Sequence, residues 1–424
     1  MTELDPPTAP PEPSTVLVTL TGKDRPGVTT RLFGALAAYD VRVLDVEQVV
    51  IRGRLVLCAL VSAPADEAGL RRAVGELAGA LDMDGECSTS PGGDANAVAE
   101  ADANAGTGAG RPAGRLHVTM LARPLLPAAI AAVTGRLARC GANIDRIVRL
   151  AREPVTALEL DVSGADPSRL RNELVAEAAR QQIDVAVQPA GLLRRAKRLV
   201  VMDVDSTLVQ QEVIELLAVR AGAHEEVAHV TAAAMQGELD FAAALRARVA
   251  LLAGLPAEVL DDVRREVRLA PGARTLVRTL KRLDHRFAVV SGGFTQIIEP
   301  LAQELGIDYA AANTLEVRDG RLTGRLVGEL IDRQGKAAAL ERFAAAAGVP
   351  LAHTVAIGDG ANDLDMLSRA GLGVAFNAKA VVREAADASV SVPYLDAVLY
   401  LLGITREEVE AADAADATGL PTAT

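Results

Sequence analysis

Residues 198–207 read RLVVMDVDST, and their pattern indicates the fold class of the second half of the chain. A short apolar run there ends in Asp203, Asp205 and two hydroxyl side chains. The same plan returns in RFAVVSG at 286–292 and in HTVAIGD at 353–359, with helical stretches between. Apolar runs that alternate with helices are typical of parallel strands in a doubly wound α/β sheet. Such sheets bind ligands at the carboxyl ends of their strands, where all three polar clusters fall.

Two carboxylates follow the first of these strands. An Asp side chain is ionised at neutral pH, so Asp203 or Asp205 could act as a nucleophile without help from a base. The other carboxyl could then serve as an acid and afterwards as a base. The alternative is structural, because Asp, Ser and Thr are also good N-caps of a following helix.

The other strand ends and one lysine offer groups for an anion and a metal. Ser291 and the amides of the VVSGG turn could donate hydrogen bonds to an anion, or could form an ordinary turn. Lys336 stands at a helix start, where it could meet the same anion or point into solvent. In GDGANDLDML, Asp359 and Asp363 supply hard oxygen ligands, although such loops are often simple turns.

Charge repulsion among these side chains is the argument for a metal ion. The four aspartates of the strand ends would gather around a single cation, Lys336. Two unit charges about 4 Å apart interact by about 4 kcal/mol at an effective dielectric of about 20. A divalent cation relieves this repulsion, and an all-oxygen ligand set favours Mg²⁺. A metal, an Asp nucleophile and a cradle for an anion together indicate phosphoryl transfer.

The order of these motifs resembles that of the haloacid dehalogenase-like (HAD) phosphohydrolases. DVDST, SGG, a lysine and GDGxND follow one another as they do in that family. Within it, residues 195–405 are most similar to the phosphoserine phosphatases. The segments that carry the resemblance are MDVDSTLVQQEVIELLA, AAMQGELDFAAALRARVALLAGL, VVSGGF and AIGDGANDLDML. The chain departs from the pattern at Gln211, where the family usually has glycine.

This resemblance implies a reaction and a role for each matching residue. The implied substrate is O-phospho-L-serine, hydrolysed to L-serine and phosphate in the last step of serine biosynthesis. Asp203 would form an aspartyl-phosphate, while Asp205 would protonate the leaving oxygen and then activate water. Mg²⁺ would be held by Asp203, the backbone carbonyl of Asp205 and Asp359. Ser291, Gly292 and Lys336 would bind the phosphoryl oxygens, and Asn362 and Asp363 would support the phosphate and the metal. Glu212 and Arg248 would bind the amino and carboxylate groups of the substrate. Met235 and Phe241 would line the site from a helical cap.

The first half of the chain carries two similar α+β patterns. Alternating apolar residues start a strand at 16–20 and again at 116–120, and each is followed by a helix and two more strands. GKDRPGV and GANI resemble the turns of ACT domains, which are βαββαβ units that bind amino acids and pair with one another. The resemblance implies a homodimer, and regulation by L-serine at a site shared by Asp24 and Asn143.

The expected architecture is therefore a doubly wound, HAD-type (Rossmann-like) parallel sheet with a helical cap, preceded by two α+β ACT domains. The linker within the first half is predicted from its lack of apolar residues that could offset ordering entropy. The expected boundaries are a disordered tail at 1–14, ACT domains at 15–87 and 115–191, a flexible linker at 88–114, a phosphatase domain at 192–405 with its cap at about 212–270, and a C-terminal tail at 406–424.

Composition and charge argue against several other classes of protein. The chain has 424 residues, too many for one domain of about 150. Only 2% of the residues are aromatic, and the net charge is −12, so nucleic acid and anionic membranes are poor partners. No apolar run reaches about 18 residues, and the acidic, proline-rich start lacks signal-peptide chemistry. We therefore expect a cytoplasmic protein.

Two other functions stay open at this level. One is a related phosphatase that acts on phosphothreonine or on a phosphoprotein. The other is a serine-sensing binding protein whose catalytic half is vestigial, although the complete set of chemical residues argues against it.

Overall fold

A computed structural model describes residues 14–51, 53–90, 115–191, 194, 196–235 and 240–418. The predicted N-terminal tail, most of the predicted linker and residues 419–424 lie outside these ranges, apart from Ser14 and residues 88–90. The chain forms two compact units. The first comprises the chain up to Ala190 together with Thr405–Glu407, and the second comprises Gly191–Ile404 and the residues from Glu408 onward.

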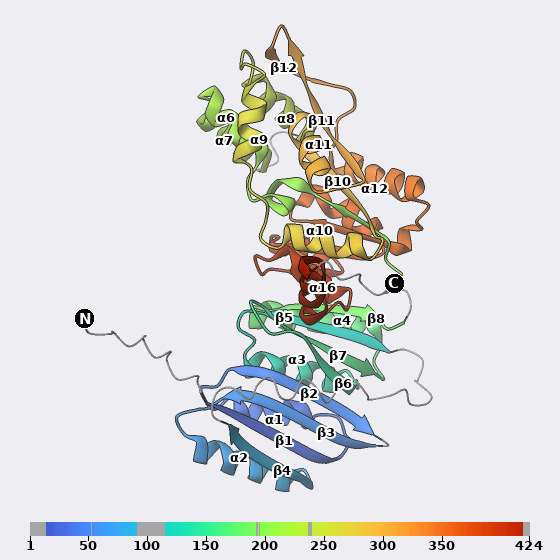
Figure 1. The fold of residues 1–424 in the computed structure, drawn as a ribbon. Coiled ribbons are helices and arrows are strands. Elements are labelled where there is room, and N and C mark those ends of the chain that lie inside the picture. Colours follow the sequence, from blue (N-terminus) through green and yellow to red (C-terminus); the bar gives the residue numbers. More distant parts are fainter. Residues whose placement is uncertain are drawn as a thin grey trace, which may run out of the picture. The chain divides into compact units, whose positions relative to one another are not determined.

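The first unit contains, within the described residues, an eight-stranded sheet in the order β4-β1-β3-β2-β6-β7-β5-β8. Its strands are β1 (Thr15–Lys23), β2 (Val43–Ile51), β3 (Arg54–Ser62), β4 (Met83–Ser90), β5 (Leu116–Ala122), β6 (Asn143–Ala151), β7 (Thr156–Ser163) and β8 (Asp184–Pro189). Its helices are α1 (Val28–Leu36), α2 (Glu67–Ala80), α3 (Pro127–Arg139) and α4 (Pro167–Gln181) (Figure 1).

Two copies of a βαββαβ unit build this sheet, and they join where β2 pairs with β6. The alternating residues Val16, Val18 and Leu20 of β1 have no exposed surface, as the period of a half-buried strand requires. They belong to one hydrophobic core that also contains the apolar residues of α1 and α3. The predicted repeat thus forms one continuous sheet with a shared core.

Two predictions about chain boundaries are corrected by the structure. The linker was expected from residue 88, but β4 continues to Ser90 because its backbone pairs with β1, with Thr15 opposite Ser90. The C-terminal tail was expected from residue 406, but α16 (Arg406–Thr418) is helical. Alanine is the best helix former, and α16 is anchored by the buried Val409 and by a 2.6 Å ion pair between Asp413 and Arg282.

The second unit contains, within the described residues, a seven-stranded sheet in the order β12-β11-β10-β9-β13-β14-β15. Its strands are β9 (Leu199–Met202), β10 (Arg286–Phe294), β11 (Tyr309–Arg318), β12 (Arg321–Val327), β13 (Thr354–Gly358), β14 (Gly373–Phe376) and β15 (Ala388–Val390). The helices outside the cap are α10 (Ala273–Arg282), α11 (Thr295–Glu304), α12 (Arg333–Ala347), α13 (Leu364–Arg369), α14 (Ala380–Ala385), α15 (Val398–Leu401) and α16.

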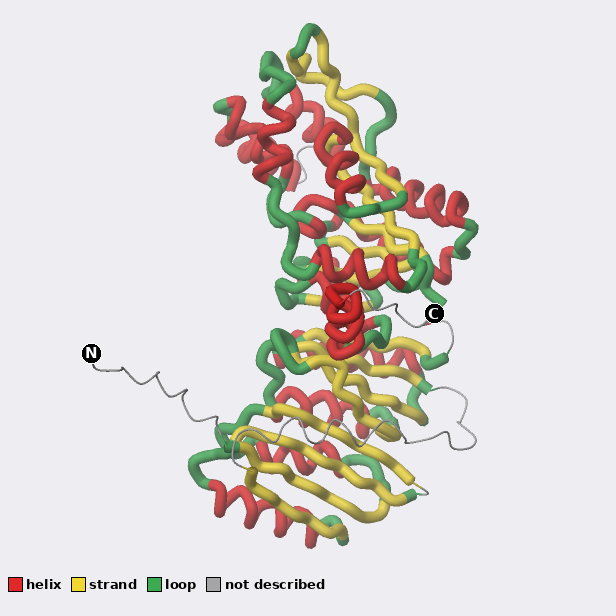
Figure 2. Tube along the Cα trace, viewed as in Figure 1, coloured by secondary structure: helices red, strands yellow, loops and turns green. Residues whose placement is uncertain are grey.

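Strand β9 lies at the centre of this sheet and is parallel to both neighbours, β10 and β13. Leu199 and Val201 pack on α12 and α13 in one hydrophobic cluster. Val200 and Met202 point to the opposite face and are also fully buried, so helices cover both faces of the sheet (Figure 2). This confirms the predicted doubly wound sheet.

Among the described residues between β9 and α10, four helices form a cap: α6 (Val213–Ala221), α7 (His224–Met235), α8 (Phe241–Ala250) and α9 (Val259–Glu266). Two linkers connect the cap to the sheet, and they bond to each other. Val209 pairs with Leu269, and the side chain of Gln211 accepts a 3.0 Å hydrogen bond from the amide of Arg268. The residue that departs from the family pattern therefore ties the two linkers together. Among the described residues, no helix is long and apolar enough to cross a membrane.

Candidate active site

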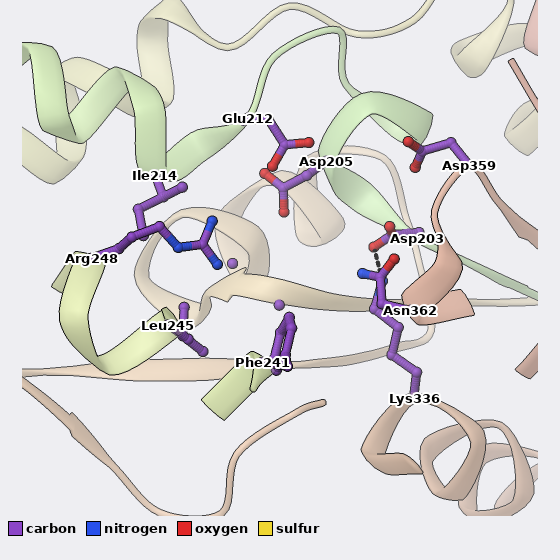
Figure 3. Close-up of a pocket in the computed structure, with 12 residues that line it drawn as sticks. Asp203, Asp205, Glu212, Ile214, Phe241, Leu245, Arg248, Lys336, Asp359 and Asn362 are labelled. Carbon is purple, nitrogen blue, oxygen red and sulfur yellow. Dashed lines mark ion pairs between the residues drawn. The ribbon is translucent and has the colours of Figure 1, made fainter. Parts of the chain in front are cut away.

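A cavity of about 150 Å³ lies where β9, β10 and β13 end beneath the cap (Figure 3). It combines side chains from the sheet with side chains from the cap helices α6 and α8. The lining residues are Asp203, Asp205, Glu212, Ile214, Phe241, Leu245, Arg248, Gly292, Gly293, Lys336, Asp359 and Asn362.

Asp203 directly follows β9 and is 4% exposed. Its Oδ1 accepts a 2.8 Å hydrogen bond from the amide of Val204 and lies 2.8 Å from the ammonium of Lys336. Within the described residues Oδ2 accepts no hydrogen bond. The segment that follows, Val204–Leu208, is a short turn in which Asp205 and Ser206 are not helical, so Asp203 does not cap a regular helix. Burial and then the charge of Asp363 raise the pKa of Asp203 well above its usual range.

Lys336 is 1% exposed, so it does not point into solvent. Its Nζ lies 2.8 Å from Asp203 and 2.7 Å from Oδ1 of Asp363. Burial alone would lower the pKa of Lys336, but these two carboxylates raise it above its ordinary value. The side chain is therefore a permanent cation, and it holds two aspartates from different strand ends in one place.

Asp205 bridges the sheet and the cap. Its Oδ1 accepts a 2.8 Å hydrogen bond from the amide of Val213 at the start of α6, and its Oδ2 accepts one of 2.8 Å from Ser291. The hydroxyl of Ser291 in turn accepts a 2.6 Å hydrogen bond from the amide of Gly293. A Cβ at Gly293 would lie 2.9 Å from Oδ2 of Asp205, so this approach requires glycine.

Three carboxylates meet at the metal side of the cavity. One oxygen from each of Asp203, Asp359 and Asp363 lies within 4.8 Å of the others, and the three residues are largely buried. Burial and the charge of Asp363 raise the pKa of Asp359 to about 6, against a 3.0 Å hydrogen bond from Thr207. A divalent cation would reverse these shifts, because it favours ionised carboxylates. The donor set, all hard oxygens with an excess of negative charge, fits Mg²⁺.

Glu212 and Arg248 face each other from the cap side of the cavity (Figure 3). Glu212 accepts a 2.8 Å hydrogen bond from Ser206, whose backbone is left-handed with φ of 57°. Burial, followed by the charge of Asp205, raises the pKa of Glu212 to about 7. Arg248 forms no ion pair within the described residues, and its Nε donates only a long 3.4 Å hydrogen bond to Ala244. Both side chains are thus placed to bind groups of opposite charge on a ligand.

Comparison with known proteins shows the family to which the chain belongs. The sequence profile of the haloacid dehalogenase-like hydrolases matches residues 200–368, and ACT-domain profiles match residues 14–88 and 116–188. A phosphoserine phosphatase of Streptomyces coelicolor is 61% identical over 401 residues, 94% of each chain. One from Mycobacterium tuberculosis is 53% identical over 412 residues, 96% of this chain and 97% of that protein. The chain belongs to the phosphoserine phosphatase family.

A solved structure supports the fold of this family member. The unliganded probable phosphoserine phosphatase of Vibrio cholerae is 34% identical and aligns with a TM-score of 0.55, over 70% of this chain and 88% of that chain. The predicted fold class, an HAD sheet preceded by two ACT domains, is therefore confirmed.

Most residues that the sequence proposed for the phosphatase site come together in the structure. The residues that line the cavity as proposed are Asp203, Asp205, Glu212, Phe241, Arg248, Gly292, Lys336, Asp359 and Asn362. Ser291 and Asp363 are fully buried behind the cavity wall, where they contact Asp205 and Lys336. Met235 ends α7, but its side chain lies outside the described residues.

The sequence analysis missed three features of this phosphatase site. Leu245 lines the cavity between Phe241 and Arg248, and the i, i+4, i+7 spacing of these three residues on α8 could have revealed it. Ile214 lines it from α6, with no signal beyond an ordinary apolar position. Asn313 of β11 is 1% exposed and donates a 2.9 Å hydrogen bond to the carbonyl of Gly292, which holds the last part of β10 in place.

Proposed function

We propose that this member of the family hydrolyses O-phospho-L-serine to L-serine and phosphate through an aspartyl-phosphate at Asp203, with Mg²⁺ as cofactor. The observation that carries the proposal is one cavity that contains Asp203 and Asp205 next to Glu212 and Arg248. The first pair supplies phosphoryl-transfer chemistry. The second pair supplies recognition of a small zwitterion.

The first half of the reaction transfers the phosphoryl group to the enzyme. Oδ2 of Asp203 attacks phosphorus, the bond to the serine oxygen breaks, and the carboxyl of Asp205 gives that oxygen a proton. In the second half Asp205 takes a proton from water, the water oxygen attacks phosphorus, and the carboxylate of Asp203 is released with phosphate. The contacts of Asp205 with Val213 and Ser291 hold its carboxyl in place for both steps.

Charge in the cavity determines what can bind there. Mg²⁺ held by Asp203 and Asp359, and supported by Asp363, would offset the negative charge of the phosphoryl group. Lys336 lines the same side of the cavity and adds a fixed positive charge. Gly292 lines the cavity, and a Cβ there would lie 3.3 Å from the ring of Phe241, so this position leaves little room for a side chain.

The substrate's amino acid part is matched by Glu212 and Arg248. A guanidinium binds a carboxylate in two-pronged fashion, and an ionised Glu212 binds an ammonium group. Burial lowers the pKa of Arg248 from its usual value, although the charges of Glu212 and Asp205 oppose this effect. The guanidinium is therefore poorly solvated, and a ligand carboxylate would stabilise its charged form.

The Arg248→Ala variant tests this recognition. We expect the KM for phosphoserine to rise roughly 100-fold, because a buried charge pair with the substrate carboxylate is lost. The KM for p-nitrophenyl phosphate, which has no carboxylate, should change by less than about threefold. Phosphate release is measured for both substrates, together with phosphothreonine and a phosphopeptide.

The matched control is Arg246→Ala, on the exposed side of the same helix, which should behave as wild type. Equal losses for phosphoserine and for the aryl phosphate would exclude the carboxylate-binding role. Faster turnover of a phosphopeptide than of phosphoserine would favour the alternative phosphatase, and no turnover of any phosphate ester would favour the vestigial binding protein.

For the first unit we propose regulation by L-serine at the junction of its two ACT domains. Asn143 donates a 3.2 Å hydrogen bond to Oδ2 of Asp24, so these residues from the two repeats meet within one chain. Burial, partly opposed by this bond, raises the pKa of Asp24. The cavity between them is only about 10 Å³, the volume of one water-sized probe. Serine must therefore replace the bond between Asp24 and Asn143 to enter.

Calorimetry with full-length protein tests this proposal. L-serine is also the proposed product, so the titration uses the Arg248→Ala variant to suppress binding in the phosphatase cavity. We expect one saturable site, whose Kd rises at least about tenfold when Asp24→Ala is added, since a charged hydrogen-bond partner is lost. Asp84→Ala, at an exposed position of β4, is the control. Binding that is unaffected by Asp24→Ala would refute this site.

The cytoplasmic location and the homodimer stay predictions of the sequence. Serine biosynthesis as the pathway follows from the proposed reaction, because L-serine is its product.

A further inference from the structure

A second, larger cavity lies in the phosphatase unit, away from the site described above. Its volume is about 470 Å³, within the usual range for a small-molecule site. It opens between the end of α10, the segment around residue 403 and one side of α16. Leu283, Leu402 and Val409 form an apolar part of its wall.

Basic side chains, together with one carboxylate, Glu408, form the other part of the wall. Arg194, Lys197 and His285 are 7%, 6% and 7% exposed, so each is more than nine-tenths buried. Arg194 donates hydrogen bonds of 2.9 and 3.1 Å to the carbonyls of Leu401 and Tyr400, which hold its guanidinium at the cavity. Buried cations are normally paired with carboxylates.

Lys197 and His285 contact backbone carbonyls, and the charge of Asp387 partly opposes the effect of burial on the pKa of Lys197. Within the described residues, the Nζ of Lys197 forms no ion pair and donates a 2.6 Å hydrogen bond to the carbonyl of Ala352. The Nδ1 of His285 contacts the carbonyl of Leu283 at 3.1 Å. Burial lowers the pKa of both Lys197 and His285. An anion in the cavity would favour the charged forms of both groups.

Thr279 of α10 offers a buried hydroxyl beside the cavity. It lines the cavity, is 5% exposed, and its hydroxyl has no hydrogen-bond partner among the described residues. A threonine within a helix usually bonds to a carbonyl of the preceding turn, and a buried hydroxyl without a partner is destabilising. The hydroxyl and methyl of threonine exchange places between staggered rotamers, so an acceptor in the cavity can satisfy this donor.

The position of the cavity separates it from the catalytic chemistry. Lys197 lies two residues before the start of β9, and His285 lies directly before β10. The cavity therefore lies at the amino ends of the strands whose carboxyl ends carry Asp203 and Ser291. Four strand residues span about 13 Å, so a ligand here does not reach the phosphatase site.

We propose that this cavity binds a small organic anion, with its charged group among Lys197, His285 and Thr279 and its apolar part against Leu402 and Val409. Inorganic phosphate alone lacks the apolar part, and a neutral lipid-like alcohol lacks the charge. The combination of a basic and an apolar wall therefore selects a carboxylate or sulfonate with a hydrocarbon body.

Fluorescence of anilinonaphthalene sulfonate, an organic anion with an aromatic body, tests the proposal on the full-length protein. We expect one saturable site from which octanoate, but neither octanol nor inorganic phosphate, displaces the probe. Ala412→Trp, which fills the cavity from α16, should weaken probe binding at least about tenfold. Ala411→Trp, at an exposed position of the same helix, is the matched control. Unaltered phosphatase activity and circular dichroism show that both variants fold.

Thr279→Val keeps the shape of the side chain and removes the hydroxyl. We expect it to weaken binding of the probe roughly tenfold, the effect of one hydrogen bond to a charged group. This variant carries the test even if Ala412→Trp fails to fold. The proposal would be overturned if the wild type showed no saturable binding or if the two tryptophan variants bound the probe with equal affinity. Displacement of the probe by octanol or by inorganic phosphate would also overturn it, as would an unchanged affinity in Thr279→Val.

Discussion

Replacing Asp203 by asparagine is expected to lower the kcat for phosphate release from phosphoserine roughly 10⁴-fold or more, because the variant lacks the attacking carboxylate oxygen. The amide is nearly isosteric, so the contacts with Val204 and Lys336 leave the fold intact. Wild-type enzyme quenched in acid during turnover of phosphoserine labelled in its phosphate should carry a covalent label that hydroxylamine removes. The Asp203→Asn protein should carry none.

The control for this experiment is Asp365→Asn, in the same GDGANDLDML segment. Asp365 forms an ion pair with Arg333 near the surface, so its replacement should leave the activity within about twofold of that of the wild type. Activity of Asp203→Asn above about 1% of wild type in freshly purified protein would exclude Asp203 as the nucleophile. Label that survives in the variant would place the phosphoryl group on another residue.

The Lys336→Met variant is expected to lose both activity and stability. Methionine is similar in length but uncharged, so Asp203 and Asp363 would be left as buried carboxylates without their cation. Removing one partner of a buried ion pair costs about 3–5 kcal/mol of unfolding free energy. This loss is measured as the difference between the two proteins in unfolding free energy, from urea unfolding at pH 7. The unfolding transition of the phosphatase unit is identified as the one that Mg²⁺ and phosphate shift to higher urea concentration.

The pH dependence of this loss has a definite sign. Burial and Asp363 already raise the pKa of Asp203 above its value in the unfolded chain, and loss of Lys336 raises it further. The folded variant then binds more protons than the unfolded one, so its stability falls as pH rises and is partly regained toward pH 5. Added Mg²⁺ should also restore part of it. The control, Lys281→Met, breaks a half-exposed pair with Asp308 and should cost about 1 kcal/mol or less. A similar loss in both variants, with no dependence on pH, would contradict the proposed charge balance.

The position of the proposed catalytic motifs was predictable because each one lies at or just after the carboxyl end of a strand. Parallel strands bring their carboxyl ends to one edge, so residues at these ends of β9, β10 and β13 had to lie near one another whatever the loops between them. The alternation within β1 likewise predicted a half-buried strand without knowledge of its neighbours. The alternation of apolar residues is a local property, and the meeting of strand ends follows from the topology of the sheet. Both can therefore be predicted from the spacing and order of residues along the chain.

The predictions failed where pairing or packing overrides local composition. Ser90 belongs to a polar stretch that looked like linker, yet the edge of β1 supplies its hydrogen bonds. Residues from 406 onward looked frayed, yet Asp413 and Val409 anchor a helix on the phosphatase unit. The residues near Ser90 or near Val409 in the sequence do not show that β1 or Arg282 will pair with these segments in the folded chain.

Order along the chain was thus enough to predict which residues gather around the phosphatase cavity, because motifs and strand ends can be recognised in short stretches of sequence. Their working relations depended on the folded packing. Lys336 could have been a solvated helix residue, and only its depth beneath two carboxylates makes it a fixed counter-charge. Asn313, which holds the carbonyl of Gly292, and Thr279, with its unpartnered hydroxyl, carry no motif at all. The reason is physical: a side chain's charge and bonding depend on burial and on neighbours far away in sequence, which exist only once the sheet and its helices have assembled.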